Sequence, residues 1–191
     1  VQQILLDGDR TSARLVVNPT RIIVEETRRS FAYLSLYGIA TDAVLVNREM
    51  PSAVGEGYFS RWLELERREL EAIEESFPVP IKHVSLRPRE VIGLEALEEL
   101  ASDLFGDSDP AQRFSTGRPI RFRHVGGRTR MEIDLPGMTK EEIEVSAKGA
   151  DLHLRVRDGR RSISLPESLV GRPIEKVRLR EPVLEVHFGD G

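Results

Sequence analysis

The sequence contains no cysteine, and this absence removes several classes of chemistry. Without thiols, the chain has no disulfide framework, no thiolate zinc site and no cysteine nucleophile. A cysteine-free composition is typical of a reducing compartment, so we expect a cytoplasmic location. The four histidines are not spaced like metal ligands, and we predict no metal site; they are His83, His124, His153 and His187.

Long apolar runs and an excess of one charge are also missing. No stretch approaches the roughly 20 apolar residues that a membrane-spanning helix needs. The first ten residues lack the basic-then-apolar pattern of a signal peptide. The 28 Lys and Arg residues nearly balance the 32 Asp and Glu residues, for a net charge of −4. This balance predicts no nucleic-acid-binding face.

A glycine-rich phosphate-binding loop is the third absence. Neither Gly-Lys-Ser nor Gly-Lys-Thr occurs anywhere in the 191 residues. Phosphoryl transfer depends on such loops and on acidic residues that hold Mg²⁺, because its catalysis consists mainly of positioning and charge neutralisation. We therefore predict that this chain alone does not hydrolyse a nucleoside triphosphate.

The residues up to 106 alternate short apolar runs with segments of helical periodicity. The expected strands are Arg14–Val17, Ala43–Val46 and Ile81–Leu86. The first expected helix begins at an Asn18 cap with Pro19 in the first turn. The second spans Phe59–Phe77. The third spans Val91–Phe105, with Leu94, Leu97, Ala101 and Leu104 on its buried side. Gly38 and Gly106 are placed to end helices. The β-α-β-α-β-α order predicts an α/β parallel sheet.

The pattern changes after Gly106. Residues 107–118 combine Gly, Ser, Asp, Pro and Thr without periodicity, which is typical of a linker. From Ile120 onward, apolar residues recur at every second position between turn signals, as in Gly126-Gly127. Seven short strands of this kind predict an all-β, immunoglobulin-like sandwich. The expected division is residues 1–106, a linker at 107–118, and a sandwich over 119–191.

Asn47 is the first candidate binding residue, because it stands at the end of the second predicted strand. Ligands of open parallel sheets collect beyond the carboxyl ends of strands. A carboxamide offers adjacent donors and an acceptor that match N6 and N7 of adenine. Asn is also common at strand ends as a turn cap, and spacing alone favours that simpler role by about two to one.

The segment after the third predicted strand is the second candidate. It turns at a proline, and its backbone could follow one edge of a base while apolar side chains pack on the face. The alternative is a capped helix start, with Glu90 near the positive end of the helix dipole. The candidate residues are Ser85, Leu86, Arg87, Pro88, Arg89, Glu90, Val91 and Ile92.

Several dispersed motifs in the first half resemble those of the arsenite-pump and tail-anchored-protein-targeting ATPases. They occur at 18–21, 26–29, 42–48, 61–62 and 88–94. The resemblance implies the back half of a P-loop ATPase domain, with Asn47 contacting adenine and residues 85–92 covering the base. It implies ATP or ADP as ligand, with Mg²⁺ held by parts of the parent protein outside this chain. Because the chain starts with Val and lacks the phosphate loop, we expect a fragment of a longer ATPase.

The same resemblance bears on partners. Eukaryotic targeting members share a zinc through a Cys-x-x-Cys pair between the positions of Asn47 and Arg61, and this chain has none. We therefore expect no zinc. An unpaired strand edge and uncovered apolar area in the first half predict a homodimer. A membrane pump or a protein client is the further partner that the family implies.

The second half resembles the α-crystallin and small heat-shock fold over about residues 119 to 188. The motifs are 134–143, 152–156, 164–166 and 182–186. This resemblance implies a sandwich whose edges can hold extended apolar segments of another chain. However, residues 157–160 form a tight hairpin where many small heat-shock proteins carry a long exchanged loop. Client binding and a purely structural, intramolecular docking role therefore both remain open.

Two functions follow from the sequence. The first is the C-terminal part of an anion-transporting or tail-anchored-protein-targeting ATPase, which supplies the adenine-recognition side and a chaperone-like domain. The alternative is a protein-interaction module without a nucleotide function.

Overall fold

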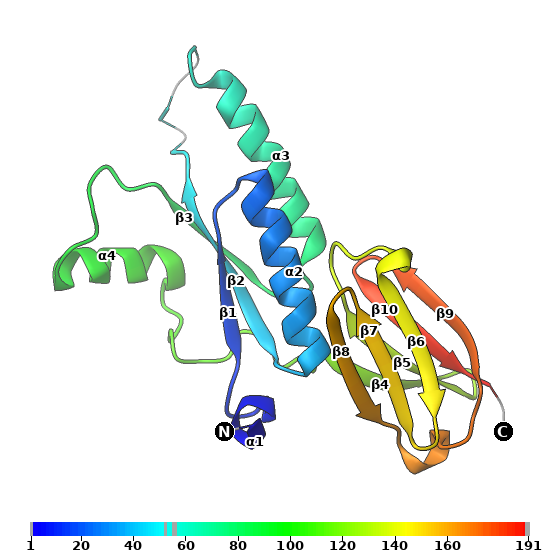
Figure 1. Ribbon diagram of the computed structural model, residues 1–191. Helices are drawn as coiled ribbons and strands as arrows, with labels where there is room; N and C mark the ends of the chain where they lie inside the picture. Colours follow the sequence, from blue (N-terminus) through cyan, green and yellow to red (C-terminus); the bar gives the residue numbers. More distant parts are fainter. Residues whose placement is uncertain (1, 52, 55–56, 190–191) are drawn as a thin grey trace.

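The computed structural model describes residues 2–51, 53–54 and 57–189. The first half contains α1 (Gln2–Leu6), β1 (Ala13–Val17), α2 (Arg21–Tyr37), β2 (Thr41–Glu49), α3 (Ser60–Ser76), β3 (Ile81–Ser85) and α4 (Leu94–Phe105). The three strands form a parallel sheet in the order β1-β2-β3. Figure 1 shows α2 and α3 side by side against this sheet. The parallel α/β arrangement predicted from the sequence is therefore present.

Helix α2 differs from the prediction at its start and agrees with it at its end. Its predicted start at Asn18 and Pro19 is wrong: the chain first makes a turn, in which the N–H of Thr20 donates to the carbonyl of Asn18, and the helix begins at Arg21. The predicted end at Gly38 is correct. Gly38 has a φ of 80°, which glycine adopts readily, and its N–H bonds the last carbonyls of the helix.

The first core lies between the sheet and these two helices. Val17, Val44 and Val46 face it from the strands, while α2 contributes Phe31 and α3 contributes Ile73. All five side chains are at most 3 % exposed. This face of the sheet is therefore closed.

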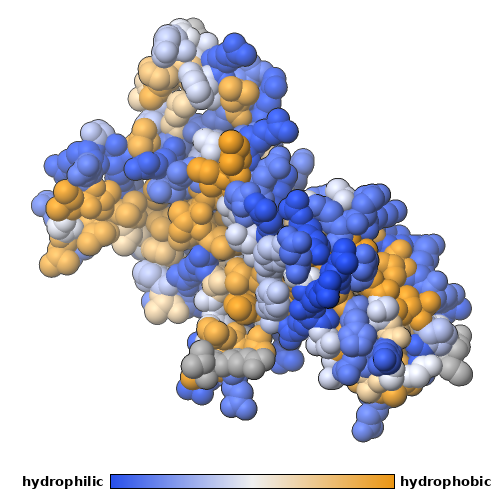
Figure 2. Space-filling view, in the orientation of Figure 1, coloured by the Kyte–Doolittle hydropathy of each residue, from blue (hydrophilic) through white to orange (hydrophobic). Residues whose placement is uncertain are grey.

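Helix α4 does not pack as the sequence predicts. Its predicted buried stripe is wrong, since Leu94 is 80 % and Leu97 50 % exposed and no residue of α4 is buried. The helix also begins at Leu94, after Gly93 with a φ of 87°, and not at Val91. Figure 1 shows the reason: α4 stands beside β3, away from the layer of α2 and α3. Figure 2 shows hydrophobic surface gathered on this side of the molecule.

The second half contains the seven strands that the period-two pattern predicts. They are β4 (Ile120–Val125), β5 (Arg128–Asp134), β6 (Ile143–Lys148), β7 (Asp151–Val156), β8 (Gly159–Ser164), β9 (Ile174–Arg180) and β10 (Val183–Phe188). They form two antiparallel sheets, β4-β5-β10-β9 and β6-β7-β8. Side chains from both sheets, including Ile133, Leu154 and Val186, share one core.

Helix α2 also belongs to this second core. Ala32 and Leu36 are fully buried among the sandwich side chains. Gly159 opens β8 at a close approach to the helix, and a Cβ there would lie 2.8 Å from Cδ2 of Leu36. Arg161 donates from Nη1 to the carbonyl of Leu36 at 3.0 Å and so caps the negative end of the helix. One helix therefore joins the two halves.

The connection at residues 107–118 lies against the sheet. Arg14 pairs with the buried carboxylate of Asp42 and donates to the carbonyls of Pro110 and Gln112. The ring of Phe114 stacks on Phe105 at 5.9 Å, with the cations of Arg14 and Lys82 over it. These contacts hold the segment in place.

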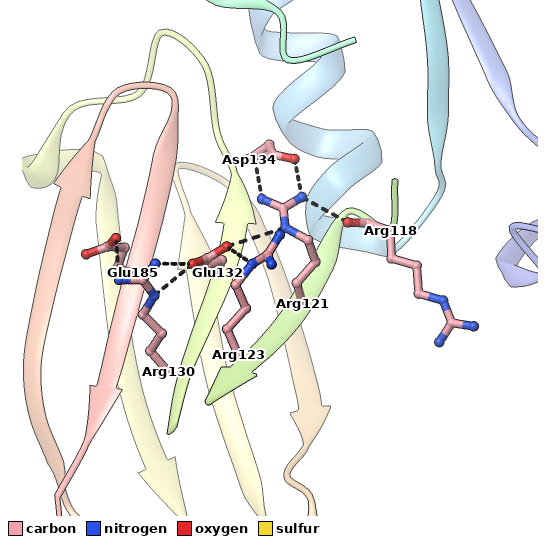
Figure 3. Close-up of polar contacts among 7 residues, drawn as sticks. All are labelled: Arg118, Arg121, Arg123, Arg130, Glu132, Asp134 and Glu185. Atoms are coloured by element: carbon pink, nitrogen blue, oxygen red, sulfur yellow. Dashed lines mark hydrogen bonds and ion pairs between the residues drawn. The ribbon is translucent and has the colours of Figure 1, made fainter. Parts of the chain in front are cut away.

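An ion-pair ladder covers the outer face of β4, β5 and β10, as Figure 3 shows. Arg121 binds Asp134 through two 2.6 Å bonds, and Nη1 also donates to the carbonyl of Arg118. Glu132 accepts from Arg123 and Arg130. Burial raises the pKa of Glu132, but these two guanidinium groups outweigh it and lower the pKa below its ordinary value. The ladder thus favours the charged form of Glu132 beneath arginine side chains.

Candidate functional site

The predicted binding residues meet in one groove at the carboxyl end of the parallel sheet. This groove has a volume of about 780 Å³ and is open to solvent on one side. Its lining contains Asn47, Ser85, Leu86, Arg87, Pro88, Arg89, Glu90, Val91 and Ile92, together with Arg48, Val84 and Leu100. The volume is within the range of small-molecule sites. The structure therefore brings together all nine residues that the sequence singles out.

Strand β2 positions Asn47. Val46 points into the core beneath α2 and α3, and successive strand side chains point to opposite faces, so Asn47 faces the side of α4. Asn47 is paired with Val84 of β3, which also lines the groove. The register then shifts between Asn47 and Glu49, with Arg48 in the left-handed region at a φ of 62°. A β-bulge therefore ends the central strand at the groove.

The loop after β3 forms the opposite wall. Its first residue is held by the sheet, because the N–H of Leu86 donates to the carbonyl of Glu49 at 2.7 Å. Leu86 is 46 % and Ile92 76 % exposed, so this wall offers accessible apolar side chains. Helix α4 starts four residues after Glu90, so the helix-start alternative for Glu90 does not apply.

The charges of the groove favour an anion. Arg87 binds Asp103 at 2.5 Å, and Arg89 lies 3.9 Å from Glu99. Glu90 is the single carboxylate among the lining residues, which also include three arginines. Mg²⁺ is held by carboxylates and phosphate oxygens, so this set of side chains does not fit a magnesium site.

Acidic residues gather on the other face of the same strand ends. His83 lies 2.5 Å from Glu49 through Nδ1 and 2.9 Å from Glu74 through Nε2. Partial burial lowers the pKa of His83, but the bonds to these two carboxylates and their charges outweigh it and raise the pKa. Burial raises the pKa of Glu66, whose carboxylate accepts the N–H of Met50. These bonds tie α3 to the ends of β2 and β3.

Three groove residues were not identified from the sequence. Arg48 follows Asn47 directly, but a regular strand would direct the two side chains to opposite faces. Val84 belongs to a predicted strand, and only its register with Asn47 places it here. Leu100 lies on α4 outside the predicted stripe, and we find no sequence signal for it.

A second group of polar side chains lies on the outer face of β6, β7 and β8. His153 bonds Ser162 at 2.8 Å across β7 and β8, a pairing that sequence spacing does not indicate. No acidic group bonds the other ring nitrogen among the contacts of the described residues, so a catalytic triad is not formed. Within residues 2–51, 53–54 and 57–189, no group of three or more His, Cys, Asp or Glu side chains is arranged to hold a metal ion. No helix in that part of the chain is long and apolar enough to cross a membrane.

Comparisons with known proteins give two family models that match different parts of the chain. A family model for anion-transporting ATPases matches residues 1–106. A model for the HSP20-like domain found in ArsA matches residues 126–188. One solved structure, "HSP18.5 from E. histolytica", aligns with 37 % of this chain and 84 % of its own at 16 % identity and a TM-score of 0.31.

Curated relatives match almost the whole chain. A "Putative arsenical pump-driving ATPase" of Prosthecochloris vibrioformis is 32 % identical over 189 residues, which are 98 % of this chain and 47 % of the relative. A "Putative arsenical pump-driving ATPase 1" of Aquifex aeolicus is 32 % identical over 186 residues, which are 95 % of this chain and 47 % of the relative. The chain thus spans about half the length of these relatives. The chain belongs to the anion-transporting ATPase family and carries an HSP20-like domain of the kind found in ArsA.

Proposed function

We propose that the groove between Asn47 and residues 85–92 binds the adenine base of ATP or ADP. One observation carries this proposal: the nine residues singled out for base recognition come from two separate segments and line one cavity. The carboxamide of Asn47 supplies paired donor and acceptor atoms for the base edge, and Leu86 and Ile92 supply apolar surface for its face. The family of the chain implies nucleotide binding, which agrees with this role.

The chain then contributes the adenine-recognition side of a larger ATPase. Phosphate chemistry and Mg²⁺ binding belong to segments with a phosphate loop, which this sequence does not contain. Binding by the chain alone is therefore weak, and hydrolysis does not occur. Two cargoes fit the family: an oxyanion delivered to a membrane pump, and a tail-anchored protein delivered to a membrane.

The test is a titration of the chain with ADP, followed by NMR. Asn47→Ala weakens binding about tenfold, because one bidentate contact to the base is lost. Asn18→Ala is the matched control, since it removes the other asparagine, beyond the end of β1 and outside the groove lining. Equal affinity for ADP in the wild type and the Asn47→Ala variant would remove the basis of the proposal.

For the second half we propose an immunoglobulin-like sandwich of the α-crystallin type, with domain limits at 1–106, 107–118 and 119–191. The two antiparallel sheets around one core support this arrangement. A role as an intramolecular docking module is favoured over client binding, because Ala32 and Leu36 of α2 already occupy part of its core. A homodimer and a cytoplasmic location remain predictions from the sequence.

A further inference from the structure

Arg48 has a backbone conformation that its side chain disfavours. Its φ of 62° lies in the left-handed region, where the Cβ of an L-residue crowds the following carbonyl. Among the described residues, Arg157 is the other non-glycine residue with a positive φ. Arg157 lies in the hairpin between β7 and β8, where a turn requires this geometry. Arg48 instead interrupts the central strand of a parallel sheet.

The bulge places Arg48 in the lining of the groove together with Asn47. In a regular strand Asn47 and Arg48 would point to opposite faces of the sheet. Both nevertheless line the same groove, because the left-handed residue breaks the alternation between Asn47 and Glu49. Such bulges redirect side chains beside functional sites. The strand end therefore places both Asn47 and Arg48 along one ligand volume.

The guanidinium group of Arg48 also differs from the other two in the groove. Arg87 and Arg89 each lie beside a carboxylate of α4. Arg48 is exposed, and no ion pair or side-chain hydrogen bond joins it to another residue of the described chain. Among the described residues it is thus the guanidinium group of the groove that has no carboxylate beside it, and it lies next to Asn47. A planar guanidinium group is well suited to bind phosphate oxygens through two bonds.

We propose that Arg48 binds a phosphate group of the adenine nucleotide whose base is bound by Asn47. The ligand of the groove is then a nucleoside phosphate, and Arg48 is the residue that distinguishes it from the uncharged nucleoside. This inference rests on the proposed function of the groove. It goes further by assigning the anionic part of the ligand to a residue of this chain.

Arg48→Gly tests the inference without endangering the fold, because glycine adopts a positive φ readily. We expect this variant to melt at the same or a higher temperature than the wild type. Its affinity for ADP should fall about tenfold, the loss expected for a charge-assisted contact, while its affinity for adenosine stays unchanged. Arg48→Lys keeps the charge but loses the planar group and should lose part of the affinity. Arg157→Gly, at the other left-handed arginine, should bind ADP like the wild type.

Titrations with ADP, adenosine and inorganic phosphate separate the outcomes. If the wild type binds ADP and adenosine equally, or if Arg48→Gly keeps full affinity for ADP, the inference fails while the adenine site remains. If inorganic phosphate binds as tightly as ADP, Arg48 holds a free anion and the assignment to a nucleotide is wrong. If the wild type binds neither ADP nor adenosine, the proposed function fails together with the inference.

Discussion

The two halves of the molecule differ in how completely they bury their apolar side chains. Among the described residues, fifteen large apolar side chains that are more than a third exposed precede residue 107, and four follow residue 119. The second half closes its core with two antiparallel sheets and one face of α2. The first half covers one face of a parallel sheet and leaves Val16, on the other face, 59 % exposed.

This difference follows from the types of sheet. Antiparallel strands joined by hairpins can complete a core within about 70 residues, whereas parallel sheets are normally covered on both faces. The open face of β1–β3 and the apolar side of α4 are therefore exposed. Exposed apolar patches of this kind mark interaction surfaces. The groove of Asn47 lies on this open side.

The largest expected effect contrasts one leucine from each half. Leu154, which is 1 % exposed, lies in the shared core of the sandwich, whereas Leu94 of α4 is 80 % exposed. Leu154→Ala should reduce the free energy of unfolding by about 2 to 5 kcal/mol. Leu94→Ala should change it by less than about 0.5 kcal/mol, as is usual for surface sites. Urea denaturation of both variants measures the contrast, and similar losses would show that α4 is packed.

A smaller effect is expected where the halves meet. Gly159→Val places side-chain atoms against Leu36 and Tyr33 of α2, where a Cβ alone would already be too close. We expect a loss of about 1 to 3 kcal/mol and faster tryptic cleavage after Arg113 and Arg118 in the connecting segment.

Arg160→Val is the matched control for this substitution. Arg160 is the next residue of β8, and its side chain is exposed. The control should leave both stability and cleavage nearly unchanged. Equal behaviour of the two valine variants would mean that α2 and the sandwich are not docked at Gly159.

The smallest effect concerns the pH dependence of the first half. Glu49 and Glu74 raise the pKa of His83 in the folded chain above its ordinary value of 6.5. Protonation of His83 therefore stabilises the folded state, fully so at pH values below 6.5. This stabilisation is lost as the pH rises through the pKa that His83 has in the folded chain. His83→Gln should therefore be less stable than the wild type at about pH 6, and the two should converge towards about pH 8. Thermal melts at both values test this. His124→Gln, at a ring that bonds Thr129, serves as the control; a pH-independent difference for His83→Gln would contradict the assignment.

Much of the fold could be predicted because local periodicity reflects burial. The runs around Val44 and Ile133 are apolar in the pattern of their strands, and both strands are present. Two features could not be predicted in this way. The apolar stripe of α4 has the same pattern whether or not another layer covers it. The apolar residues of α2 likewise have the pattern of a helix that packs against one core, although Leu36 packs into the core of the second half.

The candidate site also contains residues that could be predicted from the sequence and others that could not. Asn47 and the loop after β3 could be proposed because strand ends of a parallel sheet share one edge. Arg48 could not, because a bulge depends on the backbone register between β2 and β3, which no periodicity encodes.

The most direct test of the central claim is to titrate the unaltered chain with ADP and GDP and compare their affinities. Because the amide of Asn47 matches the edge of adenine and not that of guanine, ADP should bind about tenfold more tightly, with NMR shifts concentrated at Asn47 and residues 85–92. Equal affinity for the two nucleotides, or shifts confined to the HSP20-like half, would contradict the assignment of this groove to adenine.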